Sequence, residues 1–175
     1  MKNTILLLFL MLSILTANAQ DNVAKDTNLK KSEVKINGYY LIFGAFEGTY
    51  ERILNEESAV GISIFLPIDN NVKDIIDYYI SPYYRMYFGK KHAAGFFIEG
   101  FGMLNSIQNN YSLFSSNGNN KTTDFALGLG IGGKWITKRG FIGEINYGLG
   151  RNLFNANESN VEFVFKAGIN IGYRF

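Results

Sequence analysis

Large apolar residues alternate with polar or small residues, at a period of two, along most of the chain beyond residue 33. The alternation is clearest at the C-terminal end, where one parity is apolar and the other is mainly charged residues, asparagine and glycine. The apolar members there are Val161, Phe163, Phe165, Ala167, Ile169, Ile171, Tyr173 and Phe175. Since successive side chains of a β-strand point to opposite faces of the sheet, this period predicts strands with one apolar face.

Eight segments share the pattern, and the lengths of the connections between them alternate as well. The expected strands cover about 34–43, 46–54, 59–66, 78–88, 95–105, 123–136, 141–152 and 161–175. The short connections are 55–58, 89–94 and 137–140, and the longer ones are 67–77, 106–122 and 153–159. One further short connection, Phe-Gly-Ala at 43–45, is expected on the side of the long loops.

An even number of strands, with short turns on one side and long loops on the other, is typical of outer-membrane barrels. The sequence therefore predicts an all-β fold over residues 34–175. We expect an eight-stranded antiparallel up-and-down transmembrane β-barrel with short periplasmic turns and longer extracellular loops.

The glycines indicate which face of the barrel is apolar. Gly128, Gly130, Gly132, Gly148, Gly150, Gly168 and Gly172 share the parity of the charged residues. Small residues gain nothing at a solvent surface but make room in a narrow lumen, so we expect the apolar parity to face lipid. The opposite wall carries the inward aromatic residues Tyr39, Phe65, Tyr83, Tyr87, Phe97 and Phe101. These rings either fill the space over the glycines or leave a slot for a lipid-like ligand.

Six charged residues of the inward parity lie within about five residues of a short turn or of the C-terminus. They are Glu51, Arg85, Glu99, Lys134, Glu144 and Arg174. Such a layer of charges could be a polar plug or an ion path. Acids and bases are equal in number here, whereas a selective pore more often carries one sign in excess, so the pattern favours the plug.

Aromatic residues gather near the expected short-turn rim. They are Trp135, Phe141, Tyr173 and Phe175, with Phe88 close by. Their position predicts an aromatic girdle at the membrane interface. The terminal Phe175 after Tyr-Arg also resembles the C-terminal signal of outer-membrane barrels, which the barrel-insertion machinery reads.

The N-terminal residues have the pattern of a targeting signal. Residues 1–20 contain one lysine, an unbroken apolar run over 5–15 and the small-x-small pattern Ala17-Asn18-Ala19. This layout predicts a secretory signal peptide, cleaved after Ala19 or Gln20, and export of the mature chain. Residues 21–33 are charged and aperiodic, so we expect a flexible periplasmic lead-in.

Composition narrows the chemistry further. The 175 residues suit one domain, and 47% of them are apolar although the mean hydropathy is −0.01, which fits alternation better than apolar blocks. The absence of cysteine excludes disulfides and thiolate metal sites. A net charge of +2 gives no indication of a nucleic-acid partner.

No catalytic set can be assembled from the sequence. His92, the single histidine, falls in the basic turn 89–94, and we expect it to be a solvated turn residue. The stretch GLGIGGKW at 128–135 has the spacing of a phosphate loop, but Trp135 stands where Ser or Thr would hold magnesium. We therefore expect no enzyme, no cofactor and no metal site.

The mature chain resembles the small OmpA-type outer-membrane barrels of Bacteroidetes, in particular a family of unknown function. The stretches that carry the resemblance are GTYERILNEESAVGISIFLP, YYRMYFGKK, GFFIEGFGMLNS, GLGIGGKW and GRNLFN with the terminal GYRF. The resemblance implies an eight-stranded barrel in the cell outer membrane of a Gram-negative envelope, in contact with outer-membrane lipids and lipopolysaccharide. It implies no activity.

Two classes of function remain from the sequence. A structural or surface-interaction role, with a closed and charge-plugged lumen, is favoured by the balanced charges and the polar loops. The alternative is binding or transport of a small hydrophobic or lipid-like molecule through the barrel.

Overall fold

The computed structural model describes residues 30–108, 121–154 and 161–175. The expected signal peptide (1–20), the lead-in up to residue 29 and most of the loops 106–122 and 153–159 lie outside the described residues.

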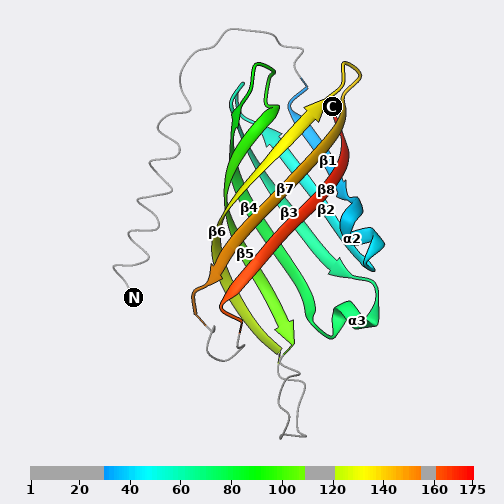
Figure 1. The fold of residues 1–175 in the computed structure, drawn as a ribbon, viewed down its shortest axis with the longest axis vertical. Helices are drawn as coiled ribbons and strands as arrows, with labels where there is room; N and C mark the ends of the chain where they lie inside the picture. Colours follow the sequence, from blue (N-terminus) through cyan, green and yellow to red (C-terminus); the bar gives the residue numbers. More distant parts are fainter. Residues whose placement is uncertain (1–29, 109–120, 155–160) are drawn as a thin grey trace, which may run out of the picture.

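The described residues form a closed barrel of eight strands in which every strand is antiparallel to its two neighbours (Figure 1). The strands are β1 (Ser32–Asn37), β2 (Ala45–Ile53), β3 (Ser58–Pro67), β4 (Ile76–Phe88), β5 (Gly95–Gln108), β6 (Lys121–Ile136), β7 (Phe141–Asn152) and β8 (Phe163–Arg174). Their order around the barrel follows the chain, and β1 pairs with β8 to close it. The predicted eight-stranded up-and-down barrel is therefore confirmed.

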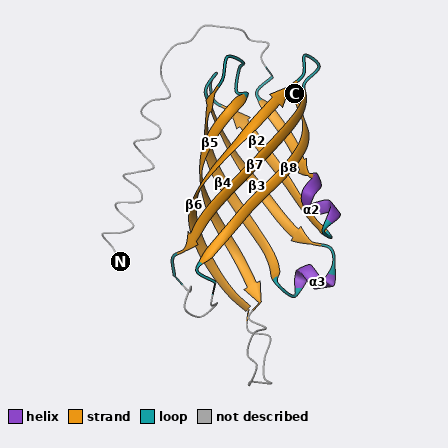
Figure 2. Cartoon of the chain, in the orientation of Figure 1, coloured by secondary structure: helices purple, strands orange, loops and turns teal. Residues whose placement is uncertain are grey.

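The two rims of the barrel differ in the length of their connections. The turns 54–57, 89–94 and 137–140 lie at the rim that also holds the C-terminus, at the top of Figure 1. The other rim carries two short helices, α2 (Gly38–Ile42) and α3 (Asn70–Lys73), which Figure 2 shows beside the strands. No helix formed by the described residues has the length and apolar character that crossing a bilayer requires.

Side chains along the strands alternate between the outer face and the interior. Leu129 and Ile171 are exposed on the outside, at 71% and 65%, whereas Lys134 and Lys166 on the same strands are buried inside. The apolar parity thus faces outward and the charged parity inward, the arrangement that the glycines predicted.

The first strand departs from the expected range of 34–43. It begins at Ser32, whose backbone exchanges hydrogen bonds of 3.1 and 2.8 Å with Phe175, and it ends at Asn37. The Asn37 side chain accepts a hydrogen bond from the Tyr39 backbone N–H at 3.1 Å and donates to the Ala167 carbonyl at 3.0 Å. This N-cap interaction replaces strand pairing with the first turn of α2.

Two further expectations fail with it. The short connection at 43–45 is wrong, because α2 extends the link between β1 and β2 to residues 38–44. Tyr39 was expected inside the barrel, but it lies in α2 with 40% of its surface exposed. Its neighbour Tyr40 instead packs edge-on against the buried Phe65, with ring centroids 5.1 Å apart.

Candidate functional site

All six charged residues predicted for the lumen are buried in the barrel interior, and ion pairs connect them. Arg85 from β4 lies at the centre of the cluster. Its guanidinium contacts Glu51 at 3.1 Å, Glu99 at 2.7 Å and Glu144 at 2.8 Å, so one side chain joins acids from three other strands. The planar fork of arginine suits this bridging, because it presents several donors in fixed directions.

Lys134 and Arg174 continue the cluster toward the short-turn rim. Glu33 and Glu51 face each other directly in the register of β1 and β2, a pairing of like charges that is destabilising by itself. The Lys134 ammonium lies between them, 2.8 Å from Glu33 and 2.5 Å from Glu51. Arg174 then pairs with Glu33 at 2.6 Å.

Besides Asp124 at the long-loop rim, four buried charges of the interior were missing from the predicted layer. Lys35 contacts Glu51 at 2.9 Å and Glu144 at 2.7 Å, and Lys166 contacts Glu99 at 3.2 Å. Glu47 accepts hydrogen bonds from the Tyr79 hydroxyl and, at 3.4 Å, from the Asn37 amide. The inward parity alone would have identified these three, whereas the fourth, Glu33, was assigned to the lead-in.

The described interior holds six buried acids and five buried bases. Asp124, near the start of β6 at the long-loop rim, accepts a hydrogen bond from the Phe154 backbone N–H at 3.1 Å. We call the other ten charged residues the lumen network. Its members are Glu33, Glu47, Glu51, Glu99, Glu144, Lys35, Arg85, Lys134, Lys166 and Arg174. Ion pairs join nine of these residues, and the tenth, Glu47, is held by hydrogen bonds from Tyr79 and Asn37. Such a network is stable only when nearly every member has partners, because an unpaired buried charge is costly.

Aromatic side chains surround the lumen network. The Tyr83 and Tyr87 hydroxyls donate to Glu51 at 2.7 and 2.6 Å. The Arg85 guanidinium carbon lies 3.7 Å from the ring centroid of Phe97, within cation–π range. The lumen at this level is thus a packed core made of charges and rings.

The inward rings also occupy the space over the inward-facing glycines of β6, β7 and β8, which we call the glycine wall. Phe101 pairs with Gly128 across β5 and β6, and Gly148 and Gly150 lie on the adjoining strand. A Cβ atom at Gly148 would lie 2.8 Å from the Phe101 ring, and one at Gly150 would lie 3.3 Å from it. The large aromatic side chains thus occupy the space that the glycines leave free. The rings fill the region where the sequence allowed a ligand slot.

The turn 89–94 closes the interior at the short-turn rim. Ala93 and Ala94 are buried, and the Ala93 N–H donates to the Glu56 carbonyl of the neighbouring turn at 2.7 Å. Arg174 donates to the carbonyls of His92 at 2.9 Å and Ala93 at 2.8 Å. The turn is therefore held by the same arginine that anchors the lumen network.

His92 is not the solvated residue that its sequence context predicted. It is half-buried, and its Nε2 atom has no hydrogen-bond partner among the described residues. Burial lowers the pKa of His92, and the positive charge of Arg174 lowers it further. No group of His, Cys, Asp and Glu side chains in the described part of the chain is placed to hold a metal ion.

The four predicted girdle residues lie on the outer face at the short-turn rim. Trp135, Phe141 and Phe175 are more than half exposed, and Tyr173 is exposed at 40%. Phe141 and Tyr173 sit on paired positions of β7 and β8, with ring centroids 5.5 Å apart. Phe88 is exposed beside Phe96 on the neighbouring strands.

Comparisons with known proteins agree with the fold. The chain is similar to the N-terminal β-barrel domain of Pseudomonas aeruginosa OprF, with a TM-score of 0.60, 14% sequence identity, and coverage of 83% of this chain and 98% of that one. A second similar structure is the Yersinia pestis outer membrane protein Ail in a phospholipid nanodisc, with a TM-score of 0.40, 16% identity, and coverage of 84% and 100%. No family model matches the chain, and no curated protein is similar enough in sequence to count as a match. At this identity the likeness to the OprF domain establishes that the two chains share the eight-stranded barrel fold.

Proposed function

We propose that this protein is an OmpA-type barrel of a Gram-negative outer membrane, with a structural or surface-interaction role and a lumen closed by ion pairs. The distribution of side chains supports the location. Large apolar residues cover the outside of all eight strands, while charged residues fill the inside. A water-soluble barrel has the reverse arrangement, and a membrane barrel has this one.

The proposed orientation places the short turns in the periplasm and the long connections outside the cell. Short turns at one rim are characteristic of the periplasmic side. In this arrangement Trp135, Phe141, Tyr173 and Phe175 occupy the periplasmic membrane interface, where aromatic rings are favoured. The leader 1–20 would direct export, and the terminal Phe175 would be read by the barrel-insertion machinery.

The lumen network is the observation that carries the proposed role. Among the described residues, ion pairs connect four buried acids to five buried bases within the interior, and the turn 89–94 lies over them. A conducting lumen needs a continuous water-filled path lined by groups that release the ion again. The rings over the glycine wall leave the hydrophobic-transport alternative without a specific support.

Fractionation tests the location. The mature chain is expected in the outer-membrane fraction, and unboiled samples are expected to migrate differently from boiled ones on a denaturing gel, because membrane barrels resist detergent until heated. N-terminal sequencing should begin at Gln20 or Asp21. Recovery of the folded chain in the soluble periplasm would contradict the membrane proposal.

Conductance tests the closed lumen. The purified protein, reconstituted in a planar bilayer, is expected to show no sustained current, because the lumen network and the turn 89–94 occupy the path. Steady conductance, with ion selectivity that changes in Lys134→Ala while stability stays the same, would show that the charges form a filter.

Deletion of the gene examines the structural role independently. The deletion strain is tested for its sensitivity to detergents and large antibiotics.

A further inference from the structure

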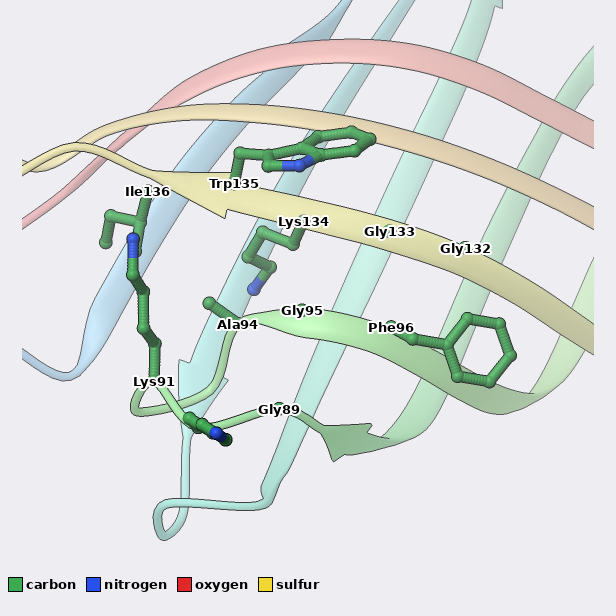
Figure 3. Close-up of a pocket in the computed structure, with 11 residues that line it drawn as sticks. Gly89, Lys91, Ala94, Gly95, Phe96, Gly132, Gly133, Lys134, Trp135 and Ile136 are labelled. Atoms are coloured by element: carbon green, nitrogen blue, oxygen red, sulfur yellow. The ribbon is translucent and has the colours of Figure 1, made fainter.

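A hollow of about 480 Å³ lies on the barrel wall at the short-turn rim, beside the turn 89–94 (Figure 3). It is bounded by the end of β6 and the start of β5, and Lys134 of the lumen network contributes to its lining. Its lining includes Lys90, Lys91, Phe96, Gly133, Trp135 and Ile136. We call it the rim hollow.

Missing side chains create the rim hollow. Gly133 pairs with Phe96 across β5 and β6 and faces outward, as Trp135 does two residues later. A Cβ atom at Gly133 would lie 3.4 Å from the Trp135 indole, so this ring leans over bare backbone. In Figure 3 the rings of Phe96 and Trp135 project from neighbouring strands, with Gly133 between them.

The rim hollow carries positive charge at its outer end. Lys90 and Lys91 are exposed in the turn, and Figure 3 shows Lys91 extending toward Ile136. The adjoining turn adds the exposed Lys138 and Arg139. No acidic residue lines the hollow among the described residues. The ammonium groups at this end therefore have no protein carboxylate inside the hollow to neutralise them.

An apolar track continues from the rim hollow along the same wall. Ile98 pairs with Ile131 two positions farther from the rim than the Phe96 and Gly133 pair. These isoleucines line a second, shallower hollow of about 300 Å³ together with Leu129, Tyr147 and Leu149. The basic groups at the rim thus lie at one end of an exposed apolar surface that continues along β5 and β6.

We propose that the rim hollow is a binding site for an anionic phospholipid of the inner leaflet of the outer membrane. The lipid phosphate lies between Lys90 and Lys91, and one acyl chain runs over Gly133 toward Ile98 and Ile131. Charge complementarity selects an anionic headgroup, and the apolar track selects a lipid over a soluble phosphate. The proposal rests on the membrane location and orientation proposed above.

Trp135 is the only tryptophan of the chain, so its fluorescence reports on this site directly. The experiment compares quenching by brominated phosphatidylglycerol and by brominated phosphatidylcholine of the same acyl chains, each mixed into vesicles that contain the folded protein. Phosphatidylglycerol is expected to be preferred by at least roughly fivefold, the effect typical of one basic side chain at an anionic surface, and high salt should reduce the preference.

Charge variants identify the site. The double variant Lys90→Gln/Lys91→Gln is expected to lose the preference, whereas Lys73→Gln/Arg151→Gln, which removes two exposed charges from the opposite rim, should keep it. Lys90 and Lys91 are exposed turn residues, so their replacement should leave folding unaffected. Gly133→Leu should weaken quenching by both lipids, because it fills the floor of the hollow.

The outcomes separate this site from the membrane location. Equal quenching by the two lipids in a correctly inserted wild-type barrel would overturn the lipid site and leave the proposed function intact. Displacement of the brominated lipid by soluble glycerol phosphate would also overturn it, because the acyl chain would then contribute nothing. A chain that stays soluble and does not insert into vesicles would overturn both proposals.

Discussion

Replacing Arg85 with alanine is expected to lower the free energy of unfolding by about 3–5 kcal/mol, the range observed when one partner of a buried ion pair is removed. The substitution takes a shared cation away from Glu51, Glu99 and Glu144, which leaves these buried acids with fewer positive partners. It also removes the group that packs on the Phe97 ring. Urea unfolding in detergent or vesicles, followed by Trp135 fluorescence or by the shift on an unboiled gel, measures the change.

Two further variants show whether the effect belongs to the buried network. Arg151→Ala breaks a 2.8 Å pair with Glu162 that is exposed at the long-loop end of β7, and it should cost less than about 1 kcal/mol. Arg85→Lys should fall between the two, because a single ammonium cannot bridge three acids as a guanidinium does. If Arg85→Ala costs no more than Arg151→Ala, the lumen network does not hold the barrel together.

Replacing Gly148 with valine is expected to cost up to about 3 kcal/mol, the upper part of the usual range for overpacking a core. Strand propensity alone predicts the opposite sign, because valine favours extended backbone more than glycine does. A Cβ at this position, however, would lie 2.8 Å from the Phe101 ring, inside the packed lumen. The same unfolding assay reports the difference.

Gly100→Val is the matched control for overpacking. Gly100 lies on β5, next to Phe101, but a Cβ there would meet no atom within 4 Å. This variant should be neutral or stabilising. The second substitution Phe101→Leu should recover part of the stability lost in Gly148→Val, because the conflict is mainly with that ring. Equal effects of valine at positions 100 and 148 would contradict the packing of aromatic rings over the glycine wall.

The alternation in the sequence determined the strand number, the position of most strands and the face that each side chain occupies. A period of two depends on the local geometry of the extended chain, so it can be read without knowing the neighbours of a strand. The inward placement of Glu51, Arg85, Glu99, Lys134, Glu144 and Arg174 followed from that parity. The exposed rim position of Trp135, Phe141, Tyr173 and Phe175 followed from parity together with the distance to the turns.

Local side-chain chemistry overrode the pattern where β1 ends. The Asn37 side chain accepts a hydrogen bond from the Tyr39 N–H and donates one to the Ala167 carbonyl of β8, and the chain turns into α2 instead of continuing as a strand. The first of these bonds is local and could have been recognised as a helix cap. The second depends on a residue far along the chain, which comes close only when the barrel closes.

Only the tertiary structure decided which charges meet. Glu33 lies opposite both Glu51 and Arg174 because the pairing of β1 with its two neighbours sets that register, and Lys134 reaches the same point from the far side of the lumen. The turn 89–94 is drawn over the interior because Arg174 at the end of β8 binds its carbonyls. Barrel closure sets strand tilt and stagger for all eight strands at once, so contacts across the lumen are a property of the closed sheet and not of any one segment.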